Sequence, residues 1–208
     1  MSRVWTPRQT RNGLEYGGSA HIYYWDPSRN PGASYENCMA NCTTYAYGRI
    51  LEAGDPAPIS GWYSAAAWHG NLINGWTYEA FDVNNCRVGD LVEWYTSDRN
   101  HVAVIEYITA TTIYVSQSYY TGDHGQSYWQ GDFDTRTAAV MGSTMQSVSN
   151  WMIANYPNRF FAYGAVTDAY NAMPDLILRN PNSIPTVDDT FKFFGRNKKT
   201  QRRRIIHV

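Results

Sequence analysis

Three short runs of β-branched and aromatic residues follow one another in the middle of the chain, at residues 88–94, 101–108 and 112–118. Each run has the length and composition of a β-strand. Because the spacers between the runs are short, neighbouring strands are expected to pair antiparallel. The runs come after helical patterns and do not alternate with them, so the sequence predicts an α+β fold, not a doubly wound sheet.

The strongest helical pattern covers residues 42–53, directly after Asn41. Asparagine is a favoured N-cap, small and apolar residues recur at helical spacing, and Gly54 followed by Pro56 ends the pattern. Cys42 is therefore expected at the first turn of a helix. We also expect a second helix over residues 64–72, a late helix over 146–155 and a closing strand over 159–166.

The two ends of the chain differ from its middle. Residues 1–36 hold Gly and Pro at short intervals and predict a loop-rich lead-in, whereas residues 37–167 carry the helical and strand patterns of a domain. Residues 190–208 hold seven Lys or Arg and no Asp or Glu, while the first 189 residues hold 10 basic and 18 acidic groups. We expect residues 168–208 to be a basic C-terminal extension that anchors the chain in an assembly or binds a partner.

Several classes of protein are excluded by what the sequence lacks. No run of about 18 apolar residues could span a membrane, and the first residues have no apolar segment typical of a secretory signal. Three cysteines cannot all pair with one another. The sequence leaves open whether Cys38 and Cys86 form a disulfide. We expect no metal and no cofactor, because the rhythm of oxygen ligands in a calcium loop is missing from the nearest candidates, Asp26, Asn30, Ser34 and Glu36.

Cys42 is the first candidate for a chemical role. The N-terminus of a helix presents unpaired amide groups and a partial positive charge, which favour a thiolate. A nucleophilic thiolate also needs a general base, and histidine has a suitable pKa near neutrality. The alternative is that Cys42 is a small core residue.

His101 is the best placed of the histidines, because it opens an apolar strand after the turn 97–100. Its ring can lie at the edge of the sheet while the rest of the strand packs. A polar group on the next strand would orient the imidazole, and Gln117 lies on that strand with Ser116 and Ser118 beside it.

Four sequence blocks resemble the CHAP family, the cysteine, histidine-dependent amidohydrolases and peptidases. The blocks are N-C-T-T-Y-A-Y-G-R at residues 41–49 with L-E at 51–52, V-G-D-L-V-E-W at 88–94, N-H-V-A-V-I-E-Y at 100–107 and I-Y-V-S-Q-S-Y-Y at 113–120. The resemblance covers about residues 37–166. It implies a papain-like fold, with Cys42 as nucleophile and His101 as base. Many relatives have Glu, followed two positions later by Asn, where this chain has Gln117 and Tyr119.

The resemblance also implies hydrolysis of an amide bond in bacterial peptidoglycan, as an N-acetylmuramoyl-L-alanine amidase or an endopeptidase. The protein would be of phage type. We favour a tail-associated lysin that opens the wall for genome entry, with residues 168–208 binding other tail proteins. An endolysin released to the host wall is one alternative, and a catalytically dead structural or wall-binding module is another. We expect neither a membrane nor nucleic acid as a partner.

Aromatic residues make up 15% of the chain, so some of them are candidates for binding the glycan and its peptide. Packing in the core is the alternative for each. The candidates for substrate binding are Trp62, Trp68, Trp94 and Tyr119.

Overall fold

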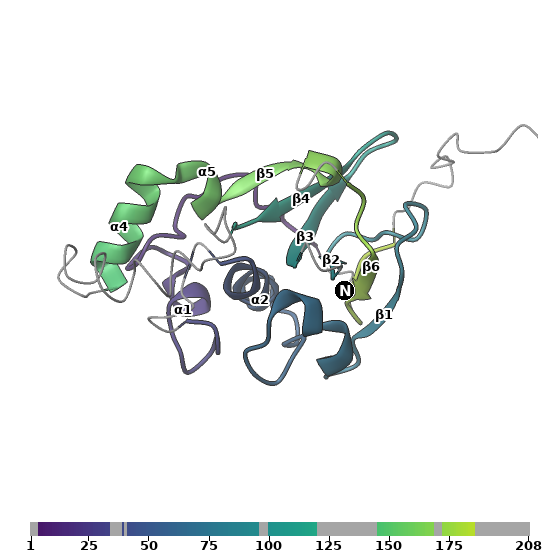
Figure 1. Cartoon of the computed structure of the whole chain (residues 1–208), viewed down its shortest axis with the longest axis horizontal. Coiled ribbons are helices and arrows are strands. Elements are labelled where there is room, and N and C mark those ends of the chain that lie inside the picture. Colours follow the sequence, from purple (N-terminus) through teal and green to yellow (C-terminus); the bar gives the residue numbers. More distant parts are fainter. Residues whose placement is uncertain are drawn as a thin grey trace, which may run out of the picture.

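The computed structural model describes residues 4–33, 39, 41–95, 100–119, 145–168 and 172–185 (Figure 1). The helices in chain order are α1 (His21–Tyr24), α2 (Cys42–Glu52), η1 (Ala65–Ala67), η2 (His69–Asn71), α4 (Met145–Asn155), α5 (Pro157–Phe160) and η4 (Val166–Asp168). The strands are β1 (Thr77–Ala80), β2 (Leu91–Trp94), β3 (His101–Ile108), β4 (Ile113–Gln117), β5 (Ala162–Ala165) and β6 (Leu176–Arg179). The fold class is α+β, as the sequence predicts.

The strands form one antiparallel sheet in the order β1-β6-β2-β3-β4-β5. Its centre is the meander of β2, β3 and β4, which confirms the pairing expected from the short spacers. Figure 1 shows α2 lying along one side of this sheet with α1 next to it, and α2 contacts β3 and β4. The helix that begins at Cys42 is therefore packed directly against the strand that begins at His101.

Alternation along the strands gives the sheet two apolar faces. On the face toward α2, Leu91 and Val104 pack with Tyr45 and Ile50. On the opposite face, buried residues of β2, β3, β4 and β6 form a second cluster, made mainly of Val92, Trp94, Ala103, Ile105, Val115 and Ile177. Both faces of β3 are covered up to Glu106, which explains why its sequence is almost continuously apolar.

The boundaries of α2 follow the local chemistry that the sequence predicts. The side-chain oxygen of Asn41 accepts hydrogen bonds from the backbone N–H of Thr43 at 3.0 Å and from its hydroxyl at 2.7 Å. At the other end Gly54 adopts a φ of 80°, which a residue with a side chain rarely tolerates, and the chain leaves the helix. Cys42 is thereby fixed in the first turn of α2.

Two local predictions are wrong. The expected helix over residues 64–72 is a pair of 3₁₀ turns, η1 and η2, because Gly70 interrupts a segment too short to support an α-helix without a capping side chain. The expected strand over residues 159–166 begins only at Ala162. Pro157 starts a helical turn, α5, before it, since proline suits the first position of a helix.

The prediction that the chain beyond residue 167 is an extension outside the domain is wrong for residues 172–185. β6 lies inside the sheet, between β1 and β2, and the side chain of Arg179 forms an ion pair with Asp90. Asn180 then binds Asp55 and the backbone of Gly89. Residues 186–208, which hold the basic cluster, lie outside the described residues. None of the helices in the described part of the chain has the length and apolar character that crossing a membrane requires.

Candidate active site

Cys42 lies where the first turn of α2 meets the start of β3. Its side chain is buried, and the backbone amide groups of Val102, Thr43 and Cys42 itself are directed at the sulfur. These amides favour the thiolate, but burial outweighs them and raises the pKa of Cys42 to about 11. Burial therefore favours the neutral thiol over the thiolate. The helix terminus alone does not create the thiolate expected from the sequence.

His101 and Gln117 are brought together at the adjoining ends of β3 and β4. Nε2 of His101 lies 2.8 Å from the side-chain oxygen of Gln117. The amide nitrogen of Gln117 donates to the hydroxyl of Tyr119 at 2.6 Å, which assigns the oxygen to the histidine. Nε2 therefore carries the proton of the neutral ring, and Nδ1 carries the lone pair that a base needs.

Two aromatic rings contact the imidazole of His101. Tyr119 stacks on it with ring centroids 5.2 Å apart and an angle of 9°, and Trp94 lies at 5.5 Å and 45°. His101 is almost fully buried as a result. Burial lowers its pKa to about 4, and the hydrogen bond to Gln117 only partly opposes this change.

The arrangement is suited to general-base catalysis by a neutral pair. The amide of Val102, the residue after His101, is directed at the sulfur of Cys42, so the start of β3 carries the candidate base and also contacts the candidate nucleophile. The raised pKa of the thiol and the lowered pKa of the imidazole both favour the form in which the proton is on sulfur. The imidazole can then accept it as the sulfur attacks.

The serines that flank Gln117 are engaged elsewhere. The hydroxyl of Ser116 donates to Glu106 at 2.6 Å, and that of Ser118 donates to the backbone oxygen of Arg159 at 3.1 Å. Of the three candidates on this strand, Gln117 is therefore the one positioned to orient His101.

A protein-family model described as CHAP domain matches residues 30–119. Residues 30–119 therefore belong to a CHAP domain. The matched segment contains Cys42, His101, Gln117 and Tyr119, and it ends before β5 and β6. A search of curated proteins and a search of solved structures each found no match. CHAP domains are generally cysteine, histidine-dependent amidohydrolases or peptidases that act on peptidoglycan.

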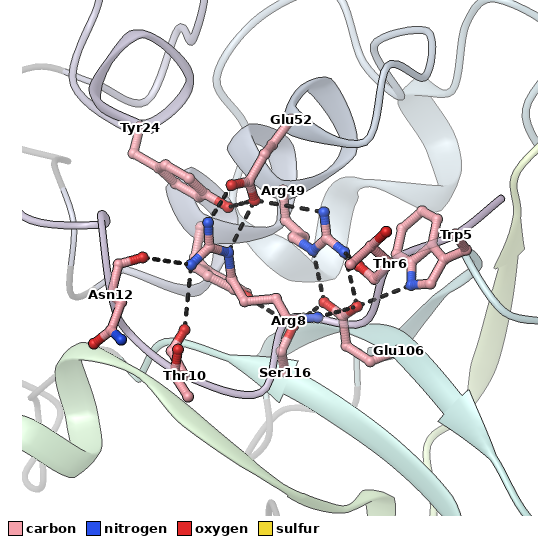
Figure 2. A network of polar contacts seen from close by, with 11 residues as sticks. Trp5, Thr6, Arg8, Thr10, Asn12, Tyr24, Arg49, Glu52, Glu106 and Ser116 are labelled. Carbon is pink, nitrogen blue, oxygen red and sulfur yellow. Dashed lines mark hydrogen bonds and ion pairs between the residues drawn. The ribbon is translucent and has the colours of Figure 1, made fainter. Parts of the chain in front are cut away.

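Behind the CHAP site, a buried network of polar groups ties the lead-in to the domain (Figure 2). Glu106 on β3 is fully buried and binds the guanidinium of Arg49 on α2 at 2.7 and 2.9 Å. The same carboxylate accepts from the indole N–H of Trp5 at 2.9 Å and from the hydroxyl of Ser116. A buried charge is tolerated when it is paired and fully hydrogen-bonded, and these contacts meet that condition.

A second part of the network surrounds Glu52 at the end of α2. Its carboxylate forms an ion pair with Arg8 and accepts from the hydroxyl of Tyr24 at 2.8 Å (Figure 2). Arg8 also donates to the backbone oxygens of Thr10 and Asn12. The loop-rich lead-in is therefore part of the packed domain. No sequence pattern indicated this partnership, because the contacts between the lead-in and the domain join residues 28 to 101 positions apart.

The four aromatic candidates for substrate binding differ in exposure. Trp68 and Trp94 are fully buried, so the prediction that they contact substrate is wrong for both: their rings fill the core, and Trp94 supports His101. Trp62 is 45% exposed, and its contact with substrate stays a prediction. Tyr119 is half-buried, and its ring covers His101 while its hydroxyl holds Gln117.

The remaining candidates have structural contacts or lie outside the description. Cys86 is a buried free thiol, so it forms no disulfide with Cys38, which is outside the described residues. The carboxylate of Asp26 binds Ser28, and the side chain of Asn30 binds the backbone of Tyr23 and Thr44. Ser34 and Glu36 are also outside the described residues.

Proposed function

We propose that this chain is a phage-type peptidoglycan hydrolase that cleaves an amide bond of the bacterial cell wall with Cys42 as nucleophile. The observation that carries the proposal is the 2.8 Å contact between His101 and Gln117, beside a cysteine held at the start of α2. The CHAP match supports the same chemistry. Cleavage between muramic acid and L-alanine and cleavage within the stem peptide or cross-bridge both fit this site.

In the proposed reaction the substrate carbonyl lies above the sulfur of Cys42. Nδ1 of His101 accepts the thiol proton while the sulfur attacks the carbonyl carbon. The backbone N–H of Cys42 stabilises the oxyanion that forms. The imidazolium then protonates the leaving amine, the C–N bond breaks, and water hydrolyses the thioester with His101 again acting as base. Throughout, Gln117 holds the ring in one orientation.

Gln117 acts here without the charge that a glutamate would supply. A neutral amide accepts the imidazole N–H but stabilises the imidazolium less than a carboxylate does. The neutral ground state of Cys42 and His101 is consistent with this weaker support. We infer an enzyme whose proton transfer is coupled to substrate binding, not one that stores a thiolate–imidazolium pair.

The test is digestion of purified bacterial walls by the wild-type chain and by Cys42→Ala. The expected result is release of new amino groups by the wild type only, and mass spectrometry of the soluble muropeptides then identifies the bond. Equal release by both proteins would contradict the assignment of Cys42.

A second candidate function is favoured by a specific observation, the burial of both Cys42 and His101. In this alternative the domain is a catalytically dead CHAP module that binds the wall or has a structural role. A zymogram containing walls distinguishes the two, because only a hydrolase produces a cleared band. Cleared bands from the wild type would exclude the dead module.

The biological setting is a further part of the proposal. We favour a lysin located in the virion tail, on the ground of the basic cluster at residues 190–208, with an endolysin acting at the host wall as the alternative. Immunoblotting of purified virions separates them. The tail assignment requires the chain to be present in the particle, and its absence from particles would favour the endolysin.

A further inference from the structure

Outside the proposed catalytic groups, a histidine is paired with a carboxylate. Nδ1 of His69 in η2 is 2.9 Å from Oε1 of Glu93 on β2. Glu93 is fully buried, and within the described residues its other oxygen, Oε2, has no hydrogen-bond partner. A buried carboxylate with an unpaired oxygen reduces stability. The proposed reaction makes no use of it, so the pair calls for a separate explanation.

The strand register places this pair beside the nucleophile. Glu93 is directly opposite Val102 in the pairing of β2 with β3, and the amide of Val102 is directed at the sulfur of Cys42. Residues directly opposite each other in an antiparallel pair have Cα atoms about 4.5–5.5 Å apart. Glu93 thus connects the catalytic end of β3 with a neighbouring patch of surface.

At that surface the ring of His69 is partly exposed and contacts the rings of two tyrosines. Tyr78 lies 5.5 Å from it between ring centroids, and Tyr95 lies at 5.2 Å. The two tyrosines are 55% and 44% exposed. Glu93 occupies Nδ1, which leaves Nε2 of His69 without a partner among the residues that the structure describes. The patch therefore presents one hydrogen-bonding ring nitrogen next to two exposed aromatic rings.

This combination fits a sugar better than a charged amine. The hydroxyls of a sugar can bond with the imidazole nitrogen while its C–H faces pack on the tyrosine rings, each of which combines an apolar face with a polar hydroxyl. An ammonium group would need an accessible negative charge. Among the described residues, the carboxylate that contacts His69 is fully buried and already engaged with its ring, and the nearby carboxylate of Asp175 accepts from the backbone N–H of Tyr95.

We propose that His69, Tyr78 and Tyr95 form a subsite for a sugar ring of the glycan strand, with Glu93 as the positioning residue that fixes the His69 ring. The inference rests on the proposed function, because a peptidoglycan hydrolase cleaves an amide that is attached to a glycan strand. A sugar held here would bring the peptide that it carries to Cys42. The subsite would then select peptide still attached to glycan over free peptide.

The test uses the full chain carrying Cys42→Ala, so that no hydrolysis occurs, and a peptide-free oligosaccharide of alternating N-acetylglucosamine and N-acetylmuramic acid. Binding is measured by calorimetry. His69→Ala and Tyr95→Ala are each expected to weaken binding about fivefold, which corresponds to the loss of one neutral hydrogen bond or its equivalent. Tyr107→Ala is the matched control, because Tyr107 is a similarly exposed tyrosine that packs on Tyr114 instead.

Three results would overturn the subsite: no binding of the oligosaccharide by the parent chain, unchanged binding by His69→Ala, or a loss in His69→Ala that appears only with free stem peptide. Glu93→Gln supplies a positioning readout, a changed tautomer of His69 in its ¹⁵N NMR spectrum. Circular dichroism verifies that each variant is folded. If the wild type binds the glycan through His69 but releases nothing from walls, the proposed function fails while the subsite stands.

Discussion

The side-chain amide of Gln117 joins His101 to Tyr119, accepting from Nε2 at 2.8 Å and donating to the tyrosine hydroxyl at 2.6 Å. Because both ends of the amide are engaged, its orientation is fixed, and so is the tautomer of His101. The stacked ring of Tyr119 holds the imidazole from a further direction. A residue that is neither nucleophile nor base thus determines which nitrogen of His101 carries the proton.

Replacing Gln117 by Glu is expected to retain or raise the turnover number, whereas Gln117→Ala should lower it and leave residual activity. A carboxylate stabilises the imidazolium, so Gln117→Glu should also raise the pKa of His101 and move the acidic limb of the pH–rate profile to higher pH. Turnover on soluble muropeptide, measured across pH, tests both effects. An acidic limb that stays in place in Gln117→Glu would contradict the role given to this residue.

Cys42→Ala and His101→Ala should each reduce wall hydrolysis by more than about 100-fold, and the double variant should be no worse than either. Nucleophile and base act in the same step, so once either is removed, removing the other causes no further loss of rate. Initial rates on purified walls provide the comparison. Cys86→Ala is the control and should keep full activity, because its thiol is buried and engaged with the backbone oxygen of Asp82. Losses that multiply would mean that the two residues act separately.

Acid should destabilise the wild type more than a variant that lacks the His101 ring. Burial lowers the pKa of His101 to about 4, so between pH 6.5 and 4 the unfolded chain binds a proton that the folded chain does not. The free energy of unfolding therefore falls as pH decreases through this window, by on the order of 3 kcal/mol. Urea unfolding of the wild type and His101→Gln at pH 7.5 and 4.5 measures the difference. Equal acid sensitivity would show that His101 titrates normally.

Glu106→Gln is expected to reduce the free energy of unfolding by ~3 kcal/mol, because it removes the nearer charge partner of the buried Arg49 guanidinium and leaves Glu52 at 3.4 Å. Chemical denaturation of both proteins gives the value. Arg29→Gln is the control: Arg29 is exposed and lies 3.7 Å from Asp26, so its loss should leave the midpoint unchanged. A Glu106→Gln protein as stable as the control would show that the network contributes no stability.

Truncation after Thr167 should abolish cooperative unfolding, whereas truncation after Pro185 should preserve it. The shorter chain lacks β6, so the edges of β1 and β2 are exposed. It also lacks Arg179, the ion-pair partner of Asp90. The longer chain retains every contact described for β6. Thermal unfolding followed by circular dichroism compares the two. A cooperative transition in the shorter chain would restore the view that the domain ends near residue 167.

The sequence predicts those parts of this fold that are encoded by neighbouring residues. The cap at Asn41, the stop at Gly54 and the β-branched runs specify α2 and the central meander, and the meander aligns His101 with Gln117. The local pattern is sufficient to predict these elements because each strand of the meander pairs with the next one along the chain. The same pattern identified Cys42 through its place at the helix start.

Other features depend on contacts between distant segments and left no local signal. β6 is only four residues long and lies between prolines, so it reads as irregular chain although it pairs with two strands. Aromatic content cannot distinguish Trp94, which is fully buried, from Trp62, which is exposed. The pKa of Cys42 could not be inferred either, because its helix position is visible in the sequence but its burial is not.

The place of β6 also sets the order in which the molecule can be completed during synthesis. β1 and β2 are consecutive in the sequence, yet the space between them is filled by residues 176–179. A nascent chain that has already emerged with Cys42 and His101 still has β1 unpaired and one edge of β2 open. The sheet closes only when residue 179 has left the ribosome, so chains interrupted before that point leave an open strand edge in place of a finished domain.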